Sequence, residues 1–235
     1  MTNRRHWLLL TAIGLAAAAS GCIVSPQPSP PGEEPALDGG LIGTDGGPES
    51  LTDSVRFVGA PGTVDPAEGS VIITNLDDAE LPTSVAVDPD GGFDVLVPGD
   101  GGDTFRFQAL ADGQRSDVTD LTVSADKTSI TPAGVGRVCL VMTTTSWFSL
   151  GEDGSAQSIL VRNDCPEAVA HQAPRLRRGQ AGFTFAPTTS GTIQPGETLI
   201  VTARRTAAGT EAEDVLIVDF LDAEQSRRAI TLVRD

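Results

Sequence analysis

The sequence has few of the side chains that enzymes most often use for covalent or acid–base chemistry. Its 235 residues contain two histidines and three cysteines, and Lys127 is the only lysine. A nucleophilic side chain needs a neighbouring base that removes its proton. No G-x-S-x-G motif occurs, and His6 lies in an N-terminal stretch that we expect to be removed, which leaves His171 as the one histidine. We therefore expect no catalytic residue and no enzymatic activity.

Ser124 and Lys127 fit the S-x-x-K spacing, which needs a helix to bring the serine and the lysine together one turn apart. This pair instead follows a strand pattern and precedes Pro132, so we interpret the match as chance. The less favoured enzyme hypothesis is a hydrolase that uses two of the many aspartates as a carboxylate pair.

The sequence also lacks C-x-x-C pairs and any glycine-rich loop that could cradle a phosphate. Zinc sites and thioredoxin-like redox chemistry are therefore not expected. One basic cluster, Arg175, Arg177 and Arg178, has no interleaved aromatic residues, so we expect no nucleic-acid binding. The cluster is most simply a solvated loop. Its functional interpretations are docking to the acidic first half or binding of an anionic envelope polymer.

No apolar run is long enough for a membrane-spanning helix, which needs roughly 20 residues. The longest, residues 7–19, follows Arg4 and Arg5 and ends in small residues. A basic start, a short apolar centre and a small-residue exit are typical of a secretory signal peptide, here residues 1–21.

The exit sequence Ala19-Ser20-Gly21-Cys22 resembles the lipobox of bacterial lipoproteins. The resemblance implies a diacylglycerol on the thiol of Cys22, cleavage just before it, and fatty acylation, such as palmitate, of the new amine. Two or more chains would anchor the protein stably. The alternative is an ordinary secreted protein with a chance cysteine. Ile23, rather than aspartate, follows the cysteine, which in this family favours the outer membrane over the inner one.

Cysteine usage agrees with an envelope location. If Cys22 carries lipid, Cys139 and Cys165 remain, and an even remainder in an oxidising compartment predicts one disulfide. Two separate buried thiols are the alternative.

Charge divides the chain near Pro132. Residues 51–132 hold fifteen acidic and four basic residues, a net charge of −11, whereas residues 133–235 hold twelve and ten, a net charge of −2. Without residues 1–21, which carry two arginines and no acid, the whole chain has a net charge of −18. Such a charge repels nucleic acid and anionic lipid surfaces.

Residues 22–50 are rich in proline and glycine, so we expect a disordered tether. From residue 51 short apolar alternations recur, separated by Gly, Asp and Pro turns: SVRFVG, GSVIITN, TSVAVD, FDVLVP, DTFRFQALA and VTDLTVS in the first half, then GRVCLVM, AQSILVRN, AGFTFAP, GETLIVTARR, EDVLIVDF and RRAITLV. This spacing is typical of antiparallel β-sandwiches. We expect domains at 51–132 and 133–235, with Trp147 and Phe148 in a core rather than in an exposed aromatic patch for sugar or protein. We interpret residues 169–179 as an inserted loop, with one helical turn at its start as the alternative.

Two resemblances add detail. Residues 69–75 and 85–93 are similar to strands of a bacterial immunoglobulin-like repeat. Asn163, the Pro195-Gly196-Glu197 triplet and Gly209 resemble positions of immunoglobulin-like domains of the major-sperm-protein and abnormal-spindle/hydin class. Both resemblances imply an immunoglobulin-like sandwich, and neither implies a catalytic residue.

Aspartates at turns are the remaining candidates for ligand binding. Asp88, Asp90 and Asp103 are the candidate ligands of a calcium site at the edge of the sandwich. Solvated turns are the simpler interpretation, because aspartate commonly bonds its own turn backbone. We therefore expect a non-enzymatic, lipid-anchored cell-envelope protein that needs no cofactor and presents two sandwiches to an unidentified envelope protein or polysaccharide. The alternative is a calcium- or glycan-binding module of a surface assembly.

Overall fold

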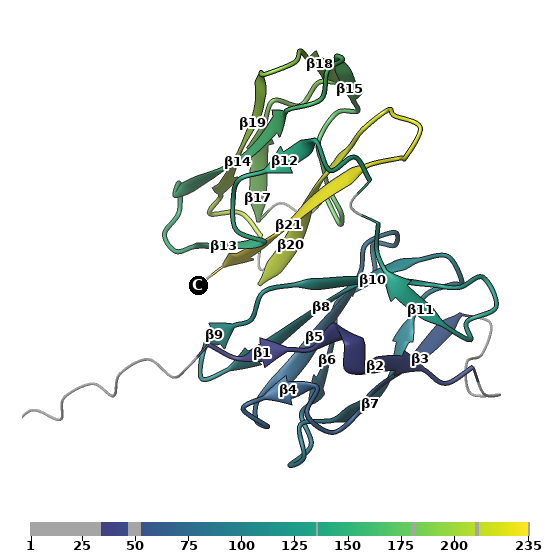
Figure 1. Ribbon diagram of the computed structural model, residues 1–235. Coiled ribbons are helices and arrows are strands. Elements are labelled where there is room, and N and C mark those ends of the chain that lie inside the picture. Colours follow the sequence, from purple (N-terminus) through teal and green to yellow (C-terminus); the bar gives the residue numbers. More distant parts are fainter. Residues whose placement is uncertain (1–33, 47–52, 135, 180–181, 210–211, 235) are drawn as a thin grey trace, which may run out of the picture. The chain divides into compact units, whose positions relative to one another are not determined.

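The computed structural model describes residues 34–46, 53–134, 136–179, 182–209 and 212–234, and this part of the chain is built from β-strands and one short 3-10 helix (Figure 1). Contacts join Gly32–Asp235 into a single unit. Within it, the strands up to Pro132 and those from Leu140 onward form separate sheets with separate cores. The expectation of an all-β fold with two antiparallel, immunoglobulin-like sandwiches is confirmed.

One face of the first sandwich is a sheet with the order β11-β10-β8-β5-β6, in which β9 also pairs with β8. Side chains alternate between the two faces of this sheet, as strand β5 shows. Val71 and Ile73 are fully buried on the inner face, whereas the neighbouring Ser70 and Ile72 point the other way. The strands are β5 (Ser70–Asn75), β6 (Thr83–Ala86), β8 (Thr104–Ala111), β9 (Gln114–Arg115), β10 (Thr119–Val123) and β11 (Ile130–Pro132).

The opposing sheet of the first sandwich has the order β2-β3-β7, and a two-stranded pair, β1-β4, lies beside it. Phenylalanine rings fill the space between the sheets. The ring of Phe57 meets those of Phe105 and Phe107 edge-on, with centroids 4.9 and 5.0 Å apart. The strands are β1 (Ala36–Leu37), β2 (Ile42–Thr44), β3 (Ser54–Gly59), β4 (Val64–Asp65) and β7 (Phe93–Pro98), and the 3-10 helix η1 spans Gly39–Leu41.

The expectation of a tether over residues 22–50 is wrong for residues 34–46. Strand β1 pairs with β4, and strand β2 pairs antiparallel with β3, so this segment is part of the first sandwich. Asp38 caps η1 by accepting a hydrogen bond from the N–H of Gly40. Composition misled here because backbone hydrogen bonds to strands already in place order a segment that has little apolar surface of its own. Residues 22–33 and 47–50 lie outside the described residues.

The second sandwich packs one sheet of order β12-β14-β19-β17 against another of order β13-β21-β20-β16, with the short pair β15-β18 beside them. Strand β13 runs parallel to β21, and the other ladders of this sandwich among the described residues are antiparallel. The strands are β12 (Leu140–Met142), β13 (Trp147–Leu150), β14 (Ala156–Asn163), β15 (Val169–His171), β16 (Arg175–Leu176), β17 (Phe183–Ala186), β18 (Gly191–Ile193), β19 (Thr198–Arg205), β20 (Glu213–Asp219) and β21 (Arg227–Arg234).

The segment 169–179 contains two short strands, which corrects the expectation of an inserted loop with or without a helical turn. It contributes β15 and β16, and Val169 and His171 of β15 are both buried. Trp147 and Phe148 are half-buried on the edge strand β13, and Phe148 packs against the second core. The segment was hard to recognise because each of its strands is too short to show an alternation.

Ile42 and Leu41 offer a matched test of the docked N-terminal segment. Ile42 is 6% exposed and belongs to the first core, whereas its neighbour Leu41 is 39% exposed. We expect Ile42→Ala to lower the free energy of unfolding by about 2–3 kcal/mol, because it removes buried methyl groups, and Leu41→Ala to change it by less than about 0.5 kcal/mol. Urea unfolding measures both, and equal effects would place the segment outside the core.

Candidate functional site at the junction of the two sandwiches

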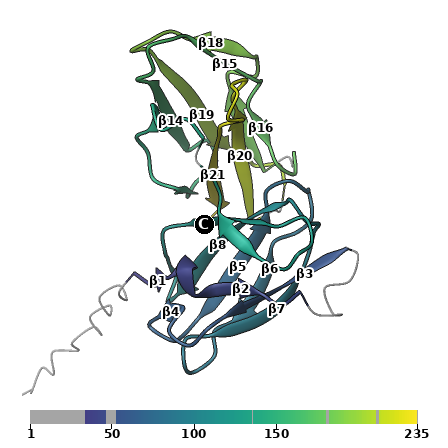
Figure 2. The same ribbon diagram turned by 45° about the vertical axis from the view of Figure 1, so that its right-hand side comes forward.

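The junction is formed where strand β21 meets β8 of the first sandwich and strand β20 meets Arg115 of β9 and Leu76 (Figures 1 and 2). Alternation along β8 explains the contact. Phe105 and Phe107 point into the first core, so Arg106 lies on the outer face, yet it is only 4% exposed. The outer face of this strand is therefore covered, and it is covered by the second sandwich.

Strand β20 is buried on both faces for the same reason. Leu216 and Val218 belong to the second core, whereas Val215 and Ile217 pack with Leu76 and Ala229 in a separate apolar cluster. The continuous apolar run VLIV reflects this double burial, because a strand with one solvated face alternates.

Arg106 is the central polar contact of the junction. Its Nε and Nη2 donate to the two carboxylate oxygens of Asp120, both at 2.8 Å, in the same sandwich. Nη2 also donates to the carbonyl of Ala229 at 3.0 Å, and Nη1 donates to Oγ1 of Thr231 at 3.3 Å. One buried guanidinium thus joins its own sheet to β21 of the other sandwich.

Two more arginines cross the junction with carboxylate partners. Arg115 donates through Nη2 to Glu213 at 2.7 Å and through Nη1 to Gln108 at 2.7 Å. Arg227 donates through Nη1 to Asp77 of the first sandwich at 2.8 Å and through Nε to Asp219 at 2.7 Å. Burial would lower the pKa of Arg227, but its hydrogen bonds to Asp77 and Asp219 outweigh burial and raise it, so the group stays charged.

Arg177, from the basic cluster of the sequence, reaches the first sandwich through backbone oxygens. It is 7% exposed, and its Nη1 donates to the carbonyls of Asn75, Asp78 and Glu80 at 3.0, 2.6 and 2.8 Å. Burial lowers the pKa of Arg177, and the charge of Asp214 opposes that shift. Arg177 therefore lies at the junction and not in a solvated loop.

The other members of that cluster stay within the second sandwich. The side chain of Arg175 pairs with Asp219 at 3.3 Å, and the backbone N–H of Arg178 donates to the carboxylate of Asp214 at 3.1 Å. The three arginines consequently do not form one anion-binding surface. Arg106, Arg115 and Arg227 were missed by the sequence interpretation, although an arginine between two core phenylalanines in DTFRFQALA was a signal for Arg106.

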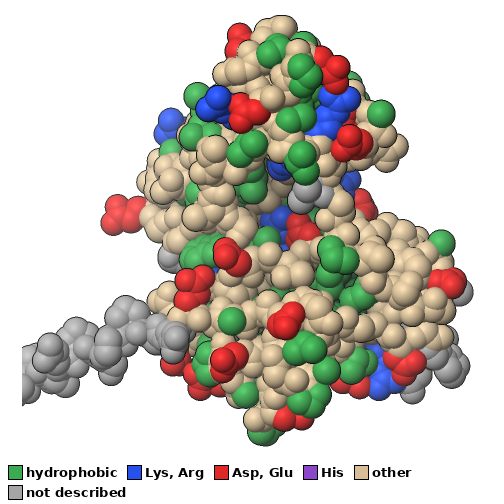
Figure 3. Space-filling view, in the orientation of Figure 1, with side chains coloured by type: hydrophobic (Ala, Val, Ile, Leu, Met, Phe, Trp, Pro, Cys, Tyr) green, Lys and Arg blue, Asp and Glu red, His purple; other side chains and the backbone are tan. Residues whose placement is uncertain are grey.

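A cleft of about 780 Å³ opens at this junction and is lined by residues of both sandwiches. The space-filling view shows acidic and basic side chains together where the sandwiches meet (Figure 3). The lining includes Asp77, Asp120, Asp219, Asp222 and Arg227. Each of the four carboxylates forms an ion pair with an arginine. The walls of the cleft are therefore polar but largely neutralised.

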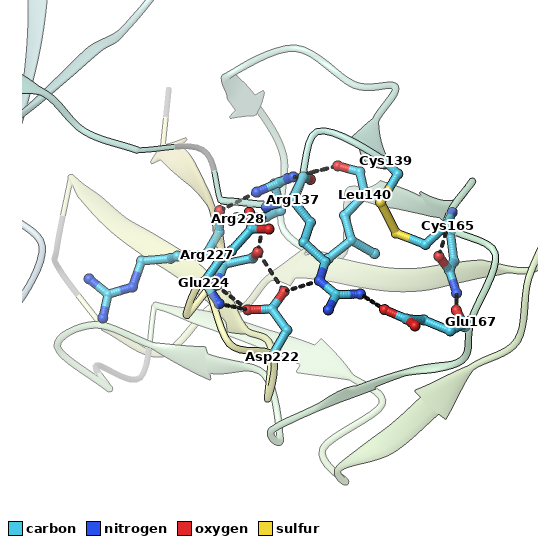
Figure 4. A network of polar contacts seen from close by, with 11 residues as sticks. Arg137, Cys139, Leu140, Cys165, Glu167, Asp222, Glu224, Arg227 and Arg228 are labelled. Carbon is cyan, nitrogen blue, oxygen red and sulfur yellow. Dashed lines mark hydrogen bonds and ion pairs between the residues drawn. A yellow bond between two sulfur atoms is a disulfide. The ribbon is translucent and has the colours of Figure 1, made fainter.

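A second network, here called the brace, holds the start of the second sandwich beside the cleft (Figure 4). It consists of the Cys139–Cys165 disulfide, the ion pairs of Arg137 with Asp222 and Glu167, and Arg228. The predicted disulfide joins Cys139 to Cys165 and is confirmed, with Cα atoms 5.0 Å apart. Arg137 lies between Asp222 and Glu167 and pairs with both carboxylates. The side chain of Asn163 accepts from the N–H of Cys165 at 2.9 Å, which fixes the loop on the other side of the disulfide.

Buried Arg228 holds the same loop through backbone oxygens. Its Nη2 donates to the carbonyl of Arg137 at 2.9 Å and its Nε to that of Leu140 at 3.1 Å, on either side of Cys139. Burial lowers the pKa of Arg228, and Asp222 opposes the shift. The connection between the sandwiches is therefore held by a covalent bond, an ion-pair chain and a buried guanidinium.

The candidate calcium ligands are not brought together. Asp88 and Asp90 lie in the turn before β7, and Asp103 lies in the turn after it, at the opposite end of that strand. Asp90 accepts from the N–H of Gly92, and Asp103 accepts from Asn75 and from the N–H of Asp100. The described residues contain no group of three or more side chains that could hold a metal ion.

The two residues of the S-x-x-K match, Ser124 and Lys127, make hydrogen bonds to different partners. The hydroxyl of Ser124 donates to Asp126, whereas the ammonium of Lys127 donates to the carbonyls of Ser54 and Gly99. Ser124 and Lys127 thus bond different partners and not each other.

Within the described ranges no helix is long and apolar enough to cross a membrane. Cys22 and the residues before it lie outside the described part of the chain.

No protein-family model and no curated protein matches this sequence. Among solved structures, the chain is similar in part to small β-sandwich domains. WR4, a major-sperm-protein family member of C. elegans, is 10% identical, covering 42% of this chain and 100% of that chain with a TM-score of 0.35. The PapD-like domain 7 of human CEP192 is 13% identical, covering 45% of this chain and 91% of that chain with a TM-score of 0.32.

Larger proteins are also similar in part. The secreted serine protease VesC of Vibrio cholerae is 9% identical, covering 72% of this chain and 46% of that chain with a TM-score of 0.32. The first two structures belong to the class that the second half of the sequence resembles. At these identities and TM-scores the likenesses carry no argument about function.

The junction can be tested by comparing two bidentate arginine–aspartate pairs. In the pair Arg106–Asp120 the arginine is buried at the junction and the aspartate is half-buried, whereas Arg56–Asp94 has similar geometry, at 2.9 and 2.6 Å, on the surface of the first sandwich. We expect Arg106→Met to lower the free energy of unfolding by about 2–4 kcal/mol, because it leaves Asp120 and the carbonyl of Ala229 without their partner. Arg56→Met should cost about 0.2–1 kcal/mol. Urea unfolding at pH 7 measures both, and similar costs would contradict a structural role for the junction.

The brace should depend on pH through Asp222, whose side chain is 3% exposed. Burial alone would raise its pKa, but hydrogen bonds from Ser226 and the charge of Arg137 hold the pKa below the ordinary value of 3.8. A lowered pKa stabilises the fold above the unfolded-state value, and this contribution is lost as the pH falls through the folded-state value. Asp222→Asn should therefore cost about 1–3 kcal/mol at pH 7. The cost should begin to shrink below about pH 3.8, the ordinary value, and should be smallest once the pH has fallen past the lower folded-state pKa, where the wild-type carboxylate also loses its charge.

Denaturant unfolding at several pH values from neutral to acid measures this difference. Glu68→Gln, at an exposed carboxylate of the first sandwich, is the matched control and should leave the free energy of unfolding unchanged throughout. A cost of Asp222→Asn that stays constant with pH would show that the charge of Asp222 does not stabilise the brace.

Proposed function

We propose that this protein is a non-enzymatic, lipid-anchored component of the cell envelope that presents two joined β-sandwiches as a single binding or spacer unit. The observation that carries the proposal is the junction. The guanidinium groups of Arg106, Arg115 and Arg227 are each bonded to both sandwiches, and that of Arg177 reaches from the second sandwich to backbone carbonyls of the first. A pair held in this way presents its surfaces in one fixed arrangement.

The lipobox-like sequence supports the anchored location. Cys22 follows a short apolar run and small residues, and the disulfide between Cys139 and Cys165 suits the oxidising conditions outside the cytoplasm. We propose the outer membrane, because Ile23 follows the cysteine. The high negative charge disfavours nucleic acid as a partner, and an envelope protein or polysaccharide remains the proposed one.

The docked N-terminal segment limits how far the unit would stand from the membrane. Strand β1 begins at Ala36, fourteen residues after Cys22. A fully extended chain spans at most about 3.6 Å per residue, so the first sandwich would lie within about 50 Å of the anchor. The proposed role is therefore exercised close to the membrane surface.

Cys22→Ser tests the anchor. We expect the wild-type protein, made in its own host, to fractionate with membranes and to have lost residues 1–21 and gained fatty acyl groups. The variant should lack the acyl groups and leave the membrane fraction, because the acylated thiol is gone. Intact-mass analysis and fractionation measure this.

Ser25→Ala, three residues beyond the cysteine, is the control and should behave as the wild type. Cys22→Ser and the wild type should unfold at the same urea concentration, because Cys22 lies before the described fold. A wild-type protein with an intact N-terminus, or with an unmodified Cys22, would overturn the proposal.

A further inference from the structure

We propose that the cleft at the junction binds a neutral oligosaccharide. This inference rests on the proposed envelope function for the source of the ligand, and on the geometry of the cleft for its chemistry. Both sandwiches contribute to the walls of the cleft. Because the junction fixes the sandwiches together, the walls of the cleft are preorganised.

Ion pairing in the walls argues against a charged ligand. Asp120 is paired with Arg106, Asp222 with Arg137, and Arg227 lies between Asp77 and Asp219. A metal ion or a cationic ligand would have to displace these arginines. An anionic ligand would meet the field of a chain whose net charge is −16 even before processing.

The hydroxyl groups of a sugar suit the hydrogen-bond donors and acceptors that the ion pairs in the cleft walls leave unused. A carboxylate offers about four acceptor positions and a guanidinium five N–H donors, so an ion pair leaves part of both capacities unused. The hydroxyls of Thr104 and Thr122 lie 3.2 Å apart at the cleft, and the exposed amides of Gln172 and Gln225 add donors and acceptors. Sugar hydroxyls both donate and accept, and they match this mixed and fixed arrangement.

An apolar side chain in the cleft fits the carbon face of a sugar ring. Leu221 lines the cleft and is 61% exposed, although Phe220 beside it is buried. An exposed leucine in a polar cleft offers a surface that the C–H groups of a pyranose can cover. The volume of about 780 Å³ and the open form suit several linked sugars more than one monosaccharide.

Saturation-transfer NMR tests the proposal with the mature, acylated protein, isolated from its host and placed in lipid nanodiscs. The probes are cellohexaose, maltohexaose and chitohexaose as neutral oligomers, glucose as a monomer, and a heparin-derived hexasaccharide as a polyanion. We expect transfer to at least one neutral oligomer, and weaker or no transfer to glucose and to the heparin fragment.

Variants locate the binding. Gln172→Ala and Leu221→Ala should each weaken the affinity for the bound oligomer about three- to tenfold, since each removes one contact. Gln157→Ala removes an exposed glutamine from β14, outside the cleft, and should bind as the wild type. Unchanged urea midpoints show that all three variants are folded.

Three results would overturn the inference: no transfer to any neutral oligomer at millimolar concentration, equal affinity of the cleft variants and the wild type, or preference for the heparin fragment. Repeating the NMR measurement with Cys22→Ser in solution, without nanodiscs, separates the two proposals. If the unanchored variant still binds, the cleft binds the oligosaccharide independently of the anchor. If the anchored protein binds none of the neutral oligomers, the proposed envelope function stands and the proposed ligand is wrong.

Discussion

The arrangement of this molecule depends on a guanidinium group that is buried between two sheets. Arg106 stands between two core phenylalanines on β8, so its own strand directs it away from the first core. A charged group there needs either water or a full set of partners, because burying it unpaired is costly. Asp120 supplies the counter-charge and β21 supplies oxygens from the other sandwich. The first sandwich therefore has a complete outer face only when the second lies on it.

This dependence explains how the remaining junction contacts are distributed. The apolar cluster of Leu76, Val215, Ile217 and Ala229 is small, so apolar burial alone would give a weak joint. Arginines at several points around it add hydrogen bonds in fixed directions, and these define one relative placement where an apolar patch would tolerate several. The disulfide and the Asp222–Arg137–Glu167 chain fix the incoming connection at the same end of the second sandwich.

Strand identity was predictable because alternation is local. SVIITN and FDVLVP show in their own letters which side chains face a core, and the even number of remaining cysteines pointed to the disulfide. The docked segment 34–46 was not predictable in this way, since its order comes from hydrogen bonds that β3 and β4 supply. The junction was also hidden: Arg177 resembled a loop cation until the carbonyls of residues 75–80 were placed beside it. Contacts between distant segments leave little trace in a single sequence.

The pairing of β1 and β2 has a mechanical consequence for an anchored protein. Both strands lie between the proposed anchor and the body of the first sandwich, and β2 lies at the edge of its sheet. Tension on the N-terminus would act first on the hydrogen bonds of β1 with β4 and of β2 with β3, and detaching β2 would also draw Ile42 out of the first core. Peeling back to residue 53 would roughly double the free chain between lipid and sandwich, to about 110 Å when fully stretched. Reversible detachment of these two strands would let an anchored protein lengthen under tension and shorten again when the tension ends.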